Sequence, residues 1–254
     1  MPKKGKTRNT NNNNRSRANV GKKKPLLLVS LITLTAVIFV AICGVYINST
    51  KQENTVQSDM KEYLQNKYGK EFTVEKPQRK ASGFGVEGYF ESLASPLHDS
   101  GLSFSVIYTK RSITDNYPGA VWSKSETSRL QPVINSYFGS NLDFAVEIKT
   151  SGTLRGNLDI RGGIMPFGEA AKMYGHKIVY RLSVRTKDTI DDVNRGYIAS
   201  KIYDFIKHEI RLDTDIIFVY SYEKGGKEYG VALDETDISR IGSATDVEKM
   251  FKEW

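Results

Sequence analysis

An unbroken apolar run from Leu26 to Ile47 constrains this chain more than any other feature of its sequence. The run is 22 residues long and contains no charged side chain. A bilayer core about 30 Å thick needs roughly 20 helical residues at about 1.5 Å each, so the run is long enough to span it. Tyr46, near one end, suits the membrane interface. We therefore predict a transmembrane helix over residues 25–47, with Leu26–Ile47 in the lipid bilayer.

The flanks of this run differ in charge. Upstream lie nine basic side chains and no acidic one: Lys3, Lys4, Lys6, Arg8, Arg15, Arg17, Lys22, Lys23 and Lys24. Downstream, Lys51 is soon followed by Glu53 and Asp59. The positive-inside rule then predicts a cytoplasmic N-terminus and a C-terminal domain outside. Asn-rich residues 9–14 offer nothing to bury, so residues 1–24 are predicted to be a disordered basic tail.

Two kinds of processing are alternatives to a retained anchor. A cleaved signal peptide has an apolar region of about 7–15 residues and a small-x-small cleavage site. The run from Leu26 is longer, and no convincing site follows it. A lipoprotein would carry a small residue before its lipidated cysteine, whereas Cys43 follows the bulky Ile42. A single-pass protein of the cell membrane is the favoured interpretation.

Charge and cysteine content limit what the external part can do. The chain has 37 basic and 29 acidic residues, and removing the nine basic residues of the tail leaves 28 against 29. The basicity therefore belongs to the tail, where it serves as a topology signal and attracts anionic lipid, unless the tail contacts an acidic partner or nucleic acid. The external domain is not predicted to bind nucleic acid. Cys43 is the only cysteine, so the external domain has no disulfide and no thiol chemistry.

After a polar stalk at residues 48–55, the pattern predicts an extracytoplasmic domain over residues 56–254. Helical spacing predicts a first helix over Val56–Tyr68 and a long helix from a cap at Thr189 to about Ile210. A helical stripe covers 130–138, with Pro132 in its first turn or at a kink, and Ser243 caps a last helix. Asp115–Gly119 is predicted to be a turn.

Alternating apolar and polar side chains predict the strands. They cover Leu102–Thr109, Leu142–Lys149, Ile178–Val184, and a hairpin of Asp215–Tyr222 with Glu228–Asp234 around Gly225-Gly226, after an extended start at Phe72–Val74. Alternation implies sheets with one covered and one wet face, hence an α+β ectodomain with an antiparallel or mixed sheet and packed helices. Glycine-rich residues 150–168 divide two strand–helix–strand stretches. Two lobes, 56–150 and 169–254, are therefore the alternative to one domain.

No motif carries a recognisable chemistry. Gly83–Gly88 matches Gly-x-Gly-x-x-Gly but lacks the preceding strand and following helix that a dinucleotide site needs. The histidines, His98, His176 and His208, lie far apart, and none has a second His or Cys at ligand spacing. We therefore predict no catalytic residue, no cofactor and no metal site.

Acidic pairs and aromatic side chains are the remaining candidates for a site. Asp191-Asp192 is interpreted as a helix start, and Asp213 with Asp215 as the flank of a turn, although paired carboxylates could serve glycan hydrolysis. Tyr117 and Trp122 are interpreted as core or sheet residues rather than as anchors of an interface.

One stretch resembles known proteins. Residues Tyr63–Val74 read Tyr-Leu-x-x-Lys-Tyr-Gly-x-x-Phe-x-Val. This 12-residue pattern resembles the start of small membrane-anchored or secreted extracytoplasmic proteins of Gram-positive bacteria, in which it leads from a first helix into a first strand. Those proteins are largely of unknown function. The resemblance therefore implies a Gram-positive cell surface and no particular activity.

The sequence thus predicts a single-pass, non-enzymatic membrane protein whose external domain binds or scaffolds an envelope protein partner. A component of a secretion or conjugation apparatus is the first alternative, because such proteins share this layout. An envelope hydrolase is the second.

Overall fold

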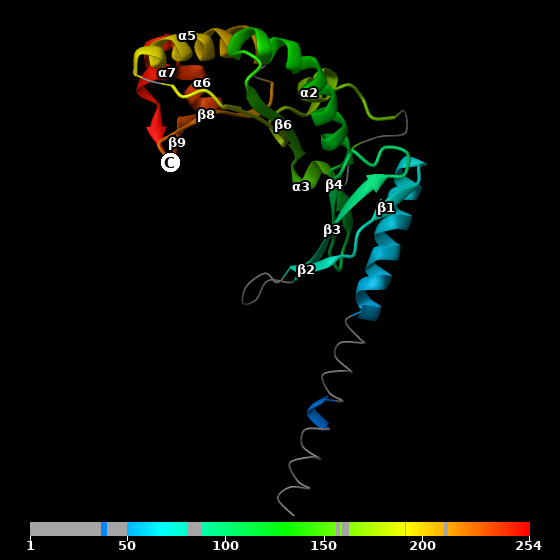
Figure 1. Ribbon diagram of the computed structural model, residues 1–254. Helices are drawn as coiled ribbons and strands as arrows, with labels where there is room; N and C mark the ends of the chain where they lie inside the picture. Colours follow the sequence, from blue (N-terminus) through cyan, green and yellow to red (C-terminus); the bar gives the residue numbers. More distant parts are fainter. Residues whose placement is uncertain are drawn as a thin grey trace, which may run out of the picture. The chain divides into compact units, whose positions relative to one another are not determined.

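The computed structural model describes residues 37–39, 50–80, 88–155, 158, 163–190, 192–210 and 213–254 (Figure 1). The chain divides into two units, Met1–Lys51 and Gln52–Trp254. In the first unit residues 37–39 are helical, and the rest of the predicted span lies outside the described residues. Of the helices that the structure describes, none is both long enough and apolar enough to cross a bilayer.

The second unit is an α+β fold, as the alternation of its strands predicted. Its described residues form two five-stranded sheets. The first sheet contains β1 (Phe72–Val74), β2 (Gln78–Lys80), β3 (Tyr89–Pro96), β4 (Phe104–Tyr108) and β5 (Ile113–Asp115). The second contains β6 (Leu142–Thr150), β7 (Ile178–Thr186), β8 (Asp215–Lys224), β9 (Lys227–Asp234) and β10 (Lys252–Glu253).

Helices precede, connect and follow these strands. Residues 50–68 form a first helix, called here the leading helix. The others are α2 (Tyr117–Phe138), α3 (Gly152–Arg155), α4 (Phe167–Tyr174), the 3-10 turn η1 (Gly175–Lys177), α5 (Asp192–Glu209), α6 (Glu235–Arg240) and α7 (Ala244–Lys249).

The second sheet has mixed topology. Its strand order is β10-β9-β8-β7-β6, and α5 crosses over between the parallel strands β7 and β8. The other pairs are antiparallel, including the predicted hairpin of β8 and β9, where Gly225 and Gly226 take positive φ angles of 61° and 76°. Two positive φ angles suit a tight hairpin turn, and glycine adopts them at little cost.

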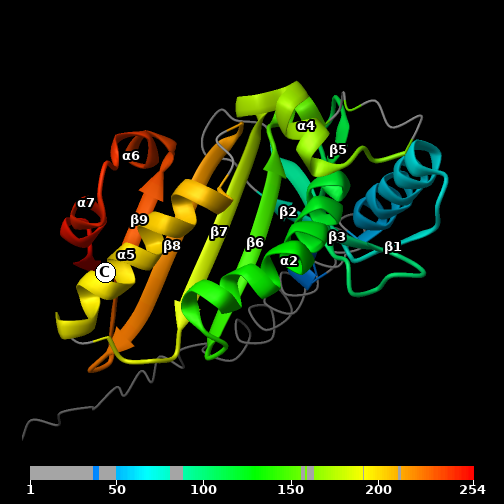
Figure 2. The same cartoon turned by 90° about the horizontal axis from the view of Figure 1, so that it is seen from above.

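The main core lies between the second sheet and the helices α2 and α5, which cover one of its faces (Figure 2). Residues of β6, β7, β8 and β9 enter it, largely in alternation, so the sheet keeps one buried and one solvent-facing side. The largest fully buried members include Ile148, Leu182, Ile202, Phe205, Phe218 and Tyr220. Burying each such side chain is worth about 1.5–3 kcal/mol.

A smaller core joins the leading helix to the first sheet. Val56, Met60 and Leu64 lie on its helical side. On its other side, the rings of Phe104 and Tyr117 lie 5.0 Å apart between centroids. Tyr117 is therefore a core residue, as is Trp122, whose indole N–H donates to the Met165 carbonyl at 2.8 Å.

Several elements begin earlier than the sequence pattern predicted. Residues 50–55, expected to be a polar stalk, are already helical. The predicted turn at Asp115–Gly119 is wrong, because α2 begins at Tyr117 with Pro118 in its first turn. Proline suits that position, since its missing N–H would have no partner in the helix anyway.

Two further differences concern the helices. Pro132 lies well inside α2, which continues through it. Helix α6 was not predicted.

The boundary between the sheets does not coincide with the suggested lobes 56–150 and 169–254. Strand β6 precedes the glycine-rich stretch but pairs with β7 along its whole length. The chain passes from the first sheet to the second through α2, so the change of sheet occurs after Asp115.

Asp115 is the centre of a buried polar network in the second unit. Its carboxylate is fully buried and accepts hydrogen bonds from Tyr63 Oη (2.9 Å), Tyr68 Oη (2.7 Å) and Lys67 Nζ (2.8 Å). It also accepts from the backbone N–H of Tyr117 at 2.9 Å. A buried charge is tolerated only when it is paired and hydrogen-bonded. The network therefore fixes the leading helix against the junction of β5 and α2.

The next residue, Asn116, connects this junction to the second sheet. Its amide donates to the Ile148 carbonyl at 3.1 Å and accepts from the Thr150 N–H at 3.2 Å. Ile148 N–H donates to Ser123 Oγ at 2.8 Å. These bonds satisfy backbone groups on the outer edge of β6, which would otherwise be open to pairing. A side chain at Gly119 would collide with the Ile148 carbonyl, so only glycine allows the close approach of α2 to β6.

Replacing Asp115 with Asn should destabilise the domain by about 3–5 kcal/mol, because Lys67 would remain mostly buried without its counter-charge. Urea denaturation of the wild type and variant measures the difference. Asp99→Asn is the matched control, since Asp99 forms a solvent-exposed ion pair with Lys124 and should cost less than about 1 kcal/mol. Equal losses in the two variants would contradict a central role for Asp115.

The same network predicts an alkaline loss of stability. Burial, reinforced by the nearby Asp115 carboxylate, raises the pKa of Tyr63 and Tyr68 far above the usual range. The unfolded chain releases these phenolic protons near pH 10 while the folded chain keeps them, so stability should fall as pH rises above about 10. Denaturation curves between about pH 8 and 11 would show it. The variant Tyr63→Phe/Tyr68→Phe should show a shallower fall, and an identical fall would contradict the assignment.

Candidate functional site

The candidates from the sequence occupy different parts of the second unit. Of the Gly83–Gly88 motif only Gly88 is among the described residues, and the side chains of Asp191 and Asp192 also lie outside them. His98 is exposed, and His208 is exposed near the end of α5 with its Nδ1 2.8 Å from the Asp204 carbonyl oxygen. His176 is the histidine that lies in a group of possible ligands.

The group contains His176, Asp215 and Glu235. Nδ1 of His176 lies 2.8 Å from Asp215 Oδ1 and 3.5 Å from Glu235 Oε2. One ligand atom from each residue lies within 4.8 Å of the other two. All three side chains reach solvent, and His176 is the most exposed at 70%. The hydrogen bond that His176 donates to Asp215, together with the charges of Glu235 and Asp215, raises the pKa of His176 above its ordinary value of 6.5.

The topology of the second sheet brings these three residues together. His176 lies in η1 just before β7, and Asp215 begins β8, where it is in register with Val179. Glu235 follows β9, whose last residue is in register with Ile217 of β8. Short His and Cys spacing along the sequence gives no sign of this group, because it joins one histidine to two carboxylates from distant parts of the chain. The parallel pairing of β7 with β8 was the missing information, since it places the first residues of both strands at the same end of the sheet.

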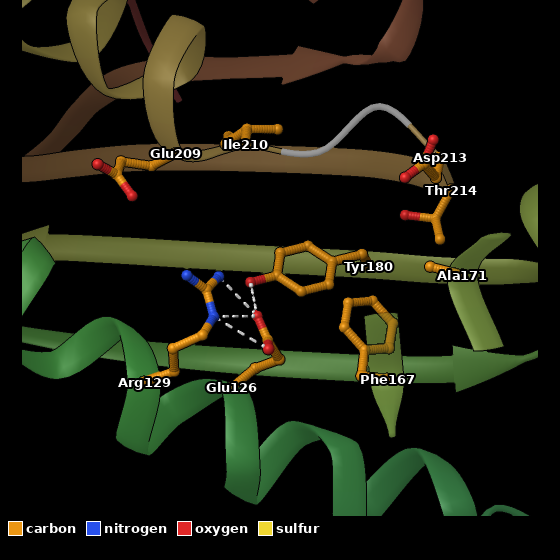
Figure 3. A pocket seen from close by; sticks show the side chains of 9 residues that line it. All are labelled: Glu126, Arg129, Phe167, Ala171, Tyr180, Glu209, Ile210, Asp213 and Thr214. Atoms are coloured by element: carbon orange, nitrogen blue, oxygen red, sulfur yellow. Dashed lines mark hydrogen bonds and ion pairs between the residues drawn. The ribbon is translucent and has the colours of Figure 1, made fainter. Parts of the chain in front are cut away.

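A second group of polar side chains surrounds a small cavity beside α2. Its lining residues are Glu126, Arg129, Phe167, Ala171, Tyr180, Glu209, Ile210, Asp213 and Thr214 (Figure 3). Glu126 accepts from Arg129 Nη2 at 2.8 Å and from Tyr180 Oη at 3.5 Å, and the Tyr180 ring stacks on Phe167. Burial, with Glu126 nearby, raises the pKa of the Tyr180 hydroxyl.

The dimensions and electrostatics of this cavity favour a structural role. Its volume is about 20 Å³, which holds about one water molecule. The Glu126 carboxylate is balanced by Arg129, whose pKa it raises through their hydrogen bonds. Glu126 forms its ion pair within α2 and accepts a hydrogen bond from Tyr180, which links the helix to β7. The small volume of the cavity leaves no room for a substrate.

The solvent-facing side of the second sheet is a third candidate. In one row across the sheet, Ala145 is in register with Ser183, Ser183 with Val219 and Val219 with Ala232. The adjacent row is Glu147, Arg181, Ile217 and Asp234. Each of these residues is exposed or half-exposed, because α2 and α5 cover only the opposite face (Figure 1).

The side chain of Trp254 extends this open face beside β9 and β10. A Cβ added to Gly230 would lie 3.1 Å from Cη2 of Trp254, so the indole lies over the glycine on this side of the sheet. Trp254 is 46% exposed, and its backbone N–H donates to the Glu228 carbonyl at 3.0 Å. Small and apolar residues thus lie beside the charged Arg181 in the middle of the open face, and Trp254 lies on its β10 side.

Comparison with known proteins gives no family. No family model matches the sequence, and no curated protein matches it. Among solved structures, the chain is similar to a DUF5037 family protein from Ruminococcus gnavus, with 16% identity and a TM-score of 0.44, over 66% of this chain and 74% of the other. The resemblance is too distant to bear on function.

The Glu126 ion pair can be tested by its effect on stability. Glu126→Gln removes the carboxylate that holds Arg129 and Tyr180, and we expect a loss of about 1–3 kcal/mol. Glu147→Gln is the control, because Glu147 forms an exposed pair with Lys149 and should change stability by less than about 1 kcal/mol. Thermal denaturation followed by circular dichroism provides both values. If Glu126→Gln left the stability of the domain unchanged, the ion pair would not be structural.

Proposed function

We propose that this chain is a single-pass membrane protein whose α+β domain lies outside the cytoplasm and binds a protein partner at the bacterial cell envelope. The uncharged run Leu26–Ile47 and the basic flank before it support the anchor and its orientation. Within that run, residues 37–39 are helical and their apolar side chains are 49–67% exposed. The leading helix is described from residue 50, so no long linker separates the run from it in sequence.

The open face of the second sheet is the observation that carries the binding proposal. Val179, Ile217 and Val219 are half-exposed in its middle. Protein interfaces combine an apolar centre with a polar rim, and tryptophan and arginine contribute most to binding at such surfaces. Arg181 stands beside Ile217 in register, and Trp254 lies at the edge. A partner with a flat surface and an exposed carboxylate opposite Arg181 fits this face.

Two other functions make different predictions. A component of a secretion or conjugation apparatus would bind a stable set of channel subunits rather than one envelope protein. An envelope hydrolase would need two carboxylates acting together. Asp213 lines the small cavity while Asp215 bonds His176, so these two acids have different surroundings.

Topology can be tested with reporters fused to the C-terminus in a bacterial host. A reporter that is active only outside the cytoplasm should be active, and one that is active only in the cytoplasm should be silent. Replacing the nine basic residues of the tail with neutral ones should weaken this orientation. Strong activity of the cytoplasmic reporter on the wild type would overturn the proposed orientation.

The binding face can be tested by crosslinking in intact cells that carry the natural partner, followed by purification of the protein. Arg181→Glu should reduce the recovery of the crosslinked partner at least about tenfold, because it reverses a charge in the middle of the face. Lys207→Glu is the matched charge reversal on α5, which covers the opposite face, and should leave recovery unchanged. Equal recovery with both variants would exclude this face. A reproducible set of channel subunits would favour the apparatus component.

A further inference from the structure

The group of His176, Asp215 and Glu235 carries an inference that is independent of the proposed binding face. We propose that these three residues bind a divalent zinc ion at the edge of the second sheet, with water completing the coordination. The proposal rests on the geometry of the three side chains, on how the backbone holds them and on their chemistry.

The spacing of the ligand atoms suits a zinc ion. Zinc bonds of about 2.0–2.1 Å in tetrahedral geometry separate neighbouring ligand atoms by about 3.3 Å. Nδ1 of His176 lies 3.5 Å from Glu235 Oε2 and 2.8 Å from Asp215 Oδ1. Each separation is within about half an ångström of the tetrahedral value. The third separation, between the carboxylates of Asp215 and Glu235, is within 4.8 Å, so the three ligand atoms are close enough to surround one ion after side-chain adjustment.

The backbone holds the three residues in place without a long loop. Asp215 is fixed by the parallel ladder through its register with Val179. Asp234, the residue before Glu235, is fixed opposite Ile217 and caps helix α6 through a bond from the Asp237 N–H. His176 follows Gly175, whose φ of 49° turns the chain between α4 and β7. Three separate elements thus converge on one point, as preorganised metal sites require.

The donor set favours zinc over the commoner hard cations. One imidazole and two carboxylates are ligands that zinc accepts readily, and zinc usually takes four ligands in all. Calcium takes six to eight oxygen ligands, and magnesium usually keeps several waters and few protein ligands. The partial exposure of Asp215 and Glu235, at 45% and 39% of the side chain, leaves space for the water that would complete the shell.

The test uses the full chain, solubilised in detergent and stripped of metal by dialysis against a chelator. Calorimetric titration with ZnCl₂ should show one ion bound per chain. Cobalt(II) should give the visible absorption bands of a tetrahedral site. His176→Ala should weaken zinc binding at least about tenfold and remove the bands, and Asp215→Asn and Glu235→Gln should each weaken it in the same direction. These variants lie at exposed positions, and circular dichroism would verify that each one folds.

His208→Ala is the matched control, because His208 is also exposed but bonds a backbone carbonyl rather than a carboxylate. It should bind zinc like the wild type. Absence of zinc binding in the wild type would overturn the proposal and leave the group as an ion pair between a histidine and two acids. Unchanged binding in His176→Ala would place the ion elsewhere and overturn it equally.

Discussion

The buried carboxylate of Asp115 is the interaction on which the rest of this domain depends. It is fully buried, and a lysine, two tyrosine hydroxyls and the first backbone N–H of α2 all donate to it. Removing any one donor leaves part of a buried charge unsatisfied, which is costly in a low-dielectric interior. Asn116, the next residue, holds the outer edge of β6. Two consecutive side chains thus fix the leading helix, α2 and the second sheet in one arrangement.

This arrangement also decides which side of the second sheet is open to solvent. Because α2 and α5 both lie on one side of the second sheet, its other side keeps its backbone paired while its side chains meet solvent. The crossover through α5 makes β7 and β8 parallel, so their starting ends lie at one edge. His176 and Asp215 meet there because of that pairing. The open face and the histidine group are therefore two consequences of one topology.

Much of the local structure was predictable because it depends on neighbouring residues. Alternation at Leu142–Lys149 and at Ile178–Val184, the hairpin at Gly225-Gly226 and the capping box at Ser243 are all confirmed. The turn predicted at Asp115–Gly119 was wrong, because asparagine, proline and glycine signal a turn and a helix start equally well. The Tyr-Leu-x-x-Lys-Tyr pattern was visible in the sequence. Its connection to Asp115, 47 residues beyond Tyr68, was not.

The sequence by itself determined most of the long strands and helices, the α+β class, the absence of a cysteine after Cys43 and the place of the basic residues. Each of these follows from composition or from periodicity along the chain. Only the tertiary structure decided that Asp115 contacts Tyr63 and Lys67 and that His176 has two acidic neighbours. It also placed Asp213 at the small cavity and Asp215 beside His176. Those contacts depend on which strands pair and in which direction. Pairing is set by packing across the whole domain, which periodicity along one strand does not encode.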